Sequence, residues 1–288
     1  MSFLDTDKEI HITGALRCAK TKYNIDFVNK GQIKFGLPRL WVDEGKNNGD
    51  GRGDVAEGMF ATFNIYDFQR VESMAEKYNI PNSNIEIDNI GDRVYYRRKR
   101  TMSLPTFCLY GIKYDLFHIE QKVGKQRIVG KIPGNYFSAF SNIHDEDINN
   151  PPEEDKPSVV IIKNYDILKS RIITKLLDIG VLENEIINAP ILYYDFKKYG
   201  QFGYYEINSQ EPKELLFKRN DFEDQSEIRF IVNSRNEEII NYLRNNTIEI
   251  GDLTDIAQMV KGYFKDGIFI SMTIQLEERD SYEQSTEN

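Results

Sequence analysis

The sequence has few cysteines and no long apolar run. Its 288 residues include two cysteines, Cys18 and Cys108, and no C-x-x-C pair. Two isolated cysteines exclude a disulfide scaffold and give a thiolate zinc site almost no support. No apolar stretch approaches the roughly 18 residues that a membrane-spanning helix needs. We therefore expect neither a metal site nor a membrane span.

The N-terminus also lacks the features of a secretion signal. Residues 1–11 (MSFLDTDKEIH) are acidic and contain no positively charged segment followed by a long apolar one. We therefore expect the chain to stay where it is made and to be cytoplasmic. Two unpaired cysteines that pack as small hydrophobic residues suit a reducing compartment.

Positive charge is in deficit, because 37 Lys and Arg face 46 Asp and Glu, a formal net charge of −9. This balance argues against nonspecific DNA binding by the whole surface. It suits docking against a basic protein face, such as a nucleic-acid-binding complex presents. The one dense basic run, YYRRKR at 95–100, fits an exposed strand that charge keeps from edge pairing. Phosphate or nucleic-acid contact is the alternative for this run, and it is not our expectation.

The hydrophobic pattern predicts an α+β fold, rich in strands, with mostly antiparallel sheets and a few helices. A Gly/Asp/Asn-rich stretch at 43–58 is expected to be a loop. Helices are expected over 22–31, 165–180 and 237–246, and over part of 252–264. The clearest expected strands cover 9–19, 60–68, 93–100, 104–112, 126–132, 158–164, 227–233 and 267–275.

An acidic, proline-rich stretch at 144–157 (HDEDINNPPEEDKP) is the best candidate for a domain boundary. It divides an N-terminal α+β half, 1–143, from a C-terminal α+β half, 158–276, and a polar tail follows at 277–288. The alternative is one continuous domain in which 144–157 is a long surface loop.

The segment FEDQSEIRF carries the clearest chemical pattern. Strand alternation predicts that Gln225, Glu227 and Arg229 lie on one face. A Gln-x-Glu pair can hold a ribose and stabilise a cationic transition state electrostatically. ADP-ribosyltransferases use such a pair together with an Arg or His on an early strand, a place that Arg17 or His11 could fill. The competing interpretation is an ordinary solvated strand face.

Several segments occur in a familiar order: FVNKGQIKFGLPRLWVDE, GDVAEG, LPTFCLY, SVVIIKNYDIL, APILYYD and LLFKRNDFEDQSEIRF. In this order the chain resembles the DUF2971-like family of bacterial proteins of unknown function. The similar order of motifs suggests an ADP-ribosyltransferase-like fold. Gln225 departs from the acidic residue of the family pattern, KNNGDGRG lengthens the acidic loop, and the family's central aromatic segment is not evident. The resemblance implies functional positions at Arg17, Phe35, Asp54, Glu57, Phe217, Lys218, Gln225, Glu227 and Arg229.

Two classes of function follow. The first is a phage or bacterial conflict protein that is an NAD-using transferase, or a degenerate derivative acting on a macromolecular partner. In the active form Arg17 would hold NAD, Gln225 would orient the acceptor and Glu227 would stabilise the ribosyl cation. The alternative is a non-catalytic, phage-encoded anti-defence inhibitor, without a cofactor, that covers a Gabija-type bacterial defence complex. A composition rich in Asn, Ile and Lys suits such a mobile-element origin.

A tyrosine-rich segment at 191–205 is the favoured protein interface, because tyrosine combines apolar area with a polar tip. We expect it to bind a protein partner and, where exposed, to let the chain self-associate as a homo-oligomer. Two ordinary sheet strands are the alternative. The predicted interface residues are Tyr193, Tyr194, Phe196, Tyr199, Phe202, Tyr204 and Tyr205.

Overall fold

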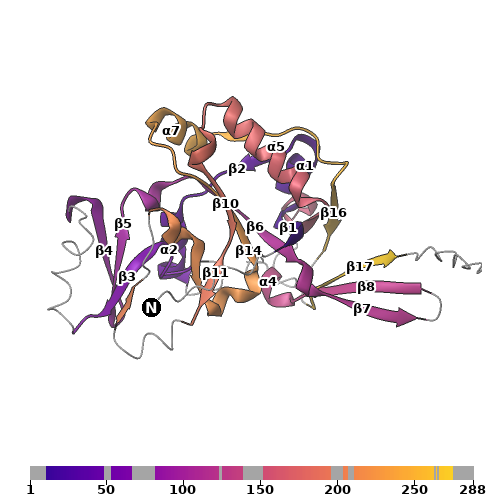
Figure 1. Cartoon of the computed structure of the whole chain (residues 1–288), viewed down its shortest axis with the longest axis horizontal. Coiled ribbons are helices and arrows are strands. Elements are labelled where there is room, and N and C mark those ends of the chain that lie inside the picture. Colours follow the sequence, from indigo (N-terminus) through magenta and orange to yellow (C-terminus); the bar gives the residue numbers. More distant parts are fainter. Residues whose placement is uncertain are drawn as a thin grey trace, which may run out of the picture.

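The computed structural model describes residues 11–48, 53–66, 82–122, 125–138, 152–195, 204–206, 211–262, 264 and 266–274. These residues form an α+β fold in which nearly all strand pairs are antiparallel, as the sequence predicts (Figure 1). Within these ranges no helix has the length and apolar character needed to span a membrane.

The largest sheet in the described part has six strands, in the order β10-β14-β6-β1-β9-β16, and every neighbouring pair is antiparallel. Its strands are β1 (Ile12–Lys20), β6 (Thr106–Lys113), β9 (Pro157–Ile162), β10 (Ile186–Pro190), β14 (Glu227–Val232) and β16 (Ala257–Lys261).

Different helices pack on the two faces of this sheet. One face packs against α1 (Thr21–Lys30), α5 (Tyr165–Asp178) and α7 (Glu237–Asn245), with Phe27, Ile172 and Leu243 fully buried between helices and sheet. The short helix α4 (Gly134–Ser138) packs on the other face through Tyr136 and Phe137. The sheet is thus the centre of the main core.

Local sequence signals explain where the helices begin and end. Gly31 ends α1 in the left-handed conformation, at φ 62°, and its N–H binds the Phe27 carbonyl oxygen at 2.9 Å. Asn164 begins α5, because its side chain accepts the N–H of Ile167 at 3.1 Å. Both helices therefore match their expected ranges closely.

The remaining strands form smaller sheets around the main one. A four-stranded sheet has the order β12-β3-β5-β4, and a three-stranded sheet has the order β17-β8-β7 (Figure 1). β15 pairs with β2, and β11 pairs with β13 in parallel. Their bounds are β2 (Gln32–Lys34), β3 (Met59–Asn64), β4 (Ile85–Ile90), β5 (Arg93–Arg98), β7 (Phe117–Lys122), β8 (Lys125–Ile132), β11 (Leu192–Tyr194), β12 (Tyr204–Glu206), β13 (Phe217–Arg219), β15 (Thr247–Glu249) and β17 (Ile268–Ile274).

The proposed boundary at 144–157 does not separate two sheets. The six-stranded sheet takes β1 and β6 from before it and β9, β10, β14 and β16 from after it. The two halves therefore share one core, which favours the continuous-domain alternative. Residues 144–151 lie outside the described residues, and Glu153–Asp155 forms a 3-10 turn.

Two expected elements are wrong. The helix α2 (Pro38–Asn48) occupies the start of the expected 43–58 loop. Pro38 is compatible with this helix because it is the first residue, where a backbone N–H would have no partner within the helix. Over 252–264, where a helix was expected, Ala257–Lys261 forms the strand β16. It pairs with the edge of β9, so tertiary pairing outweighs the local pattern.

We predict that Gly31→Ala destabilises the protein by about 3 kcal/mol, through left-handed strain and overpacking together. An added Cβ would clash with the Gly251 carbonyl oxygen and the Ile250 side chain. Gly91→Ala is the matched control, because its φ is 61° and no described atom lies within 4 Å of its added Cβ. It should cost about 1 kcal/mol. Equal losses for both variants in urea unfolding would contradict this packing.

Candidate functional site

A cavity lies where β1 and β6 separate in the middle of the six-stranded sheet. The two strands pair as far as Leu16 and Tyr110. Beyond that point Thr106 of β6 instead forms a bridge to Gly36. Cys18 and Cys108 would face each other if the pairing continued, but they line the cavity instead. The change of partner along β6 therefore creates the cavity.

The cavity has a volume of about 270 Å³. Its walls come from the strands β1, β2, β6, β13 and β14, from the helices α2 and α4, and from the 3-10 helix before β14. Four lining residues are cationic and two are acidic. The lining residues are Arg17, Cys18, Lys34, Gly36, Trp41, Glu44, Thr106, Phe107, Cys108, Leu109, Tyr110, Tyr136, Lys218, Gln225, Glu227 and Arg229.

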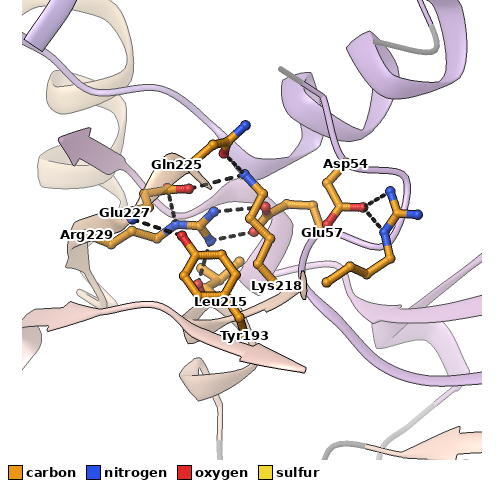
Figure 2. Close-up of polar contacts among 9 residues, drawn as sticks. Asp54, Glu57, Tyr193, Leu215, Lys218, Gln225, Glu227 and Arg229 are labelled. Atoms are coloured by element: carbon orange, nitrogen blue, oxygen red, sulfur yellow. Dashed lines mark hydrogen bonds and ion pairs between the residues drawn. The ribbon is translucent and has the colours of Figure 1, made fainter. Parts of the chain in front are cut away.

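Glu227 is the acidic centre of the cavity wall. It begins β14 directly after Ser226, whose φ of 38° turns the chain out of the preceding 3-10 helix. The backbone N–H of Glu227 donates to the Tyr193 hydroxyl at 2.9 Å (Figure 2). Its side chain is only 8% exposed, so its position is fixed by its neighbours.

Arg229 binds the carboxylate of Glu227 and is itself fully buried. Its Nε donates to Glu227 Oε1 at 2.6 Å, and its two terminal nitrogens contact the two carboxylate oxygens of Glu57 at 2.5 and 2.9 Å (Figure 2). It also donates to the Leu215 carbonyl oxygen. The guanidinium lies 5.1 Å from the ring of Trp41 in α2. Two carboxylates thus share one buried cation.

Lys218, in β13, joins Gln225 to Glu227. Its Nζ lies 2.6 Å from Gln225 Oε1 and 3.2 Å from Glu227 Oε2 (Figure 2). The ammonium also lies 4.8 Å from the ring centre of Phe222. Alternation along a strand brings Glu227 and Arg229 together, whereas Gln225 ends a 3-10 helix and reaches the same group through Lys218.

Two further arginines, Arg219 and Arg97, bind the loop at 53–58 that carries Glu57. Arg219 donates to Asp54 at 2.8 Å, and Asp54 in turn accepts the N–H of Ala56 at 2.9 Å. Arg97 of β5 donates to the Glu57 carbonyl oxygen at 2.8 Å. The acidic positions Asp54 and Glu57 are therefore buried pairing partners for arginines. They do not form a cation site.

The surroundings control the charge of each group in the cavity. Burial alone would raise the pKa of Glu227, but Arg229 and Lys218 outweigh it and hold that pKa well below its usual range. Burial, with Glu227 alongside, raises the pKa of the Cys108 thiol well above its usual value. Burial also raises the pKa of Tyr110 to about 12. At neutral pH the ionised carboxylate of Glu227 therefore lies in the cavity with the neutral Cys108 thiol and the neutral Tyr110 phenol.

Arg17 lines the same cavity but lies on the opposite face of the six-stranded sheet from Glu227. It lies opposite Val160 on the face that packs against α1, whereas Glu227 lies opposite Tyr110 on the other face. Its guanidinium lies 4.9 Å from the Phe27 ring centre. The structure thus places Arg17 and Glu227 around one cavity, from opposite sides of the sheet.

His11 does not join this site. It is exposed and precedes β1, six residues from Arg17, which is about 20 Å along an extended strand. It is not among the residues that line the cavity. The structure therefore does not bring His11 to this cavity, and its expected cofactor contact stays a prediction.

The tyrosine-rich segment is partly internal, contrary to the expected exposed interface. Tyr194 is 8% exposed and packs with Met59 and Phe217, and Tyr193 binds the backbone of Glu227. These two residues face the protein because β11 pairs with β13 beside the cavity. Of the other predicted interface residues, Phe196, Tyr199 and Phe202 lie outside the described residues. Tyr204 and Tyr205 are described only as backbone, in β12.

Sequence reasoning missed the aromatic part of the cavity. Trp41, Tyr110 and Tyr136 all line it. Tyr110 could have been found, because the antiparallel pairing of β6 with β14 places it opposite Glu227. Trp41 and Tyr136 come from helices whose positions depend on distant contacts.

The chain matches no family model, no curated protein and no solved structure in the comparisons with known proteins. Among the described residues no group of three or more His, Cys, Asp and Glu side chains could hold a metal ion. The chemistry of the cavity must therefore be read from its own residues.

We predict that Glu227→Gln lowers the free energy of unfolding at pH 7 by about 3–5 kcal/mol, because it leaves buried cations short of a partner. The folded pKa of Glu227 is depressed, so its contribution is present above its unfolded pKa of about 4.3 and is lost as the pH falls. The difference between wild type and variant should therefore shrink from pH 6 toward pH 3. Urea unfolding across that range tests this, and a constant difference would contradict an ionised Glu227.

Proposed function

We propose that the cavity binds a ribosyl compound and that the protein is an NAD-using transferase of ADP-ribosyltransferase-like fold, or a degenerate derivative of one. The observation that carries this proposal is the ionised carboxylate of Glu227, which lines the cavity beside the Gln225 amide. A carboxylate fixed before the reaction stabilises positive charge with little reorganisation.

The reaction needs a carboxylate near the anomeric carbon of the ribose. When the C–N bond to nicotinamide breaks, nicotinamide leaves with the bonding electron pair and the ribose ring becomes cationic. Glu227 stabilises that cation and accepts hydrogen bonds from ribose hydroxyls. An acceptor nucleophile then adds to the anomeric carbon and loses its proton. Gln225 orients the acceptor, and Lys218 positions both side chains.

The neutral cavity groups suit a sugar. Cys108 and Tyr110 stay protonated at neutral pH because burial raises their pKa values. The thiol and the phenol can donate hydrogen bonds to a sugar, and neither adds a negative charge that would compete with Glu227. The alternative anti-defence inhibitor stays a prediction, as do a protein partner, self-association and a cytoplasmic location. Tyr194 is buried and the Tyr193 hydroxyl binds the Glu227 backbone, so both are engaged within the protein and not on the free face that the inhibitor hypothesis needs.

We predict that the wild-type protein binds NAD and releases nicotinamide. Glu227→Gln should slow release by about 100-fold or more, as the loss of one preorganised charge does elsewhere. Release is measured by chromatography and binding by calorimetry.

The matched control is Glu214→Gln. Glu214 is a fully buried carboxylate that accepts from Arg98 at 2.6 Å and does not line the cavity. This variant should keep wild-type release whatever its cost in stability. Folded wild-type protein that neither binds NAD nor releases nicotinamide would contradict the proposal, as would equal losses in the two variants.

A further inference from the structure

The proposed transfer releases a proton from the acceptor. When an acceptor hydroxyl bonds to the anomeric carbon, its oxygen becomes positively charged, and its proton must pass to a base within hydrogen-bond reach. The groups assigned so far stabilise the ribosyl cation or orient the acceptor. A further group in the cavity wall is therefore needed to take the proton.

Most titratable groups in the cavity wall cannot serve as this base. The lining arginines and lysines are cations, which have no acceptor site. Burial raises the pKa values of Cys108, Tyr110 and Tyr136, so these three groups keep their protons at neutral pH. Cys18 is a buried thiol in apolar surroundings, which favour the neutral form.

Gln225 and Glu227 are also unsuited to this role. The side chain of Gln225 is a neutral amide, which does not take up a proton near neutral pH. Both oxygens of Glu227 are engaged, Oε1 by Arg229 at 2.6 Å and Oε2 by Lys218 at 3.2 Å (Figure 2). The two cations hold its pKa well below the usual range, so Glu227 is a weak base.

Glu44 is the other carboxylate of the cavity lining. It lies in α2, three residues after Trp41, a spacing that places both residues on one face of the helix. The Trp41 ring lies 5.1 Å from the guanidinium of Arg229, which in turn binds Glu227. The helix face that carries Glu44 is therefore the face turned toward the site.

The carboxylate of Glu44 is not engaged by the protein. Within the described part of the chain it forms no ion pair or hydrogen bond, whereas its neighbour Asp43 pairs with Arg39 at 3.8 Å. Glu44 is half-buried, so it reaches both the cavity and solvent. It can accept a proton from a ligand and pass it on to water.

The cavity is small enough for both carboxylates to act on one ligand. At roughly 30 Å³ per water molecule, its 270 Å³ corresponds to about nine waters. This is the scale of one ribose with a small acceptor beside it. The helix cannot move away freely, because a Cβ added to Gly45 would lie 3.0 Å from the Gly53 backbone.

We propose that Glu44 is the catalytic base of the transfer and that the acceptor is an oxygen nucleophile, a neutral hydroxyl or water. As the acceptor oxygen bonds to the anomeric carbon, nicotinamide leaves with the electron pair of the broken C–N bond, and the hydroxyl proton passes to the Glu44 carboxylate. A carboxylate suffices, because the new bond makes this proton acidic. A guanidinium acceptor, with a pKa above 12, would need a stronger base. This inference rests on the proposed function and names its base and acceptor class.

The test compares methanol with azide as acceptors in the reaction of the full-length protein with NAD. Methanol loses a proton when it reacts, whereas the azide anion has none to lose. Glu44→Gln should slow the formation of methyl ADP-ribose at least tenfold and leave the formation of the ribosyl azide at the wild-type rate. Glu44→Asp should restore part of the reaction with methanol. The products are separated by chromatography and identified by mass spectrometry.

The matched control is Asp43→Asn, because Asp43 lies in the same helix but outside the cavity lining. This variant should react with both acceptors as wild type does. Equal losses with methanol and azide in Glu44→Gln would give Glu44 a structural role only and overturn the proposal. A wild-type rate with methanol in that variant would overturn it as well.

The base and the transferase chemistry fail separately. Wild-type reactions with both acceptors that Glu227→Gln slows and Glu44→Gln does not would remove the base and keep the transferase. Folded wild-type protein that forms neither product from NAD would remove the transferase, and the base with it.

Discussion

The neutralisation of Arg229 is the interaction on which the rest of the site depends. Its guanidinium is fully buried and is shared between Glu57, from the loop before β3, and Glu227, at the start of β14. Removing one partner of such a group is far more costly than the pair is worth, because an uncompensated charge is left in the interior. The 53–58 loop is thereby fixed to the six-stranded sheet. Glu227 consequently stays ionised where a buried carboxylate would otherwise be neutral.

The second constraint is the change of strand partner along β6. Thr106 pairs with Gly36, and a Cβ on Gly36 would lie 3.3 Å from the Trp41 ring. A residue without a side chain therefore lets α2 approach the sheet and close one side of the cavity. The opening between β1 and β6 makes residues from both faces accessible from one space. This is why Arg17 and Glu227 line one cavity from opposite sides of a sheet.

Much of the fold could be predicted from the sequence, because its signals are local. Short hydrophobic segments located β1, β6, β9 and β14, and capping residues set the ends of α1 and α5. β16 could not be predicted, because its strand conformation depends on pairing with β9. The loop predicted at 43–58 is wrong at its start for a related reason. Its polar composition is typical of a loop, yet proline at position 38 begins a helix that tertiary packing completes.

The candidate site was predicted in part, for the same physical reasons. Strand alternation correctly placed Glu227 and Arg229 on one face, and both line the cavity together with Arg17 and Gln225. Alternation could not show that Arg17 faces α1, since that depends on the register of β1 against β9. The bridging role of Lys218 requires β13 to lie beside β11, a parallel contact with no local signature.

The most direct test of the central claim is a crystal structure of the protein with NAD. The account predicts electron density for the ribose next to nicotinamide in the cavity, with a ribose hydroxyl within hydrogen-bond distance of the Glu227 carboxylate. It also predicts that the Arg229 contacts to Glu57 and Glu227 are unchanged. NAD bound elsewhere on the molecule, or with no ribose hydroxyl near Glu227, would contradict it.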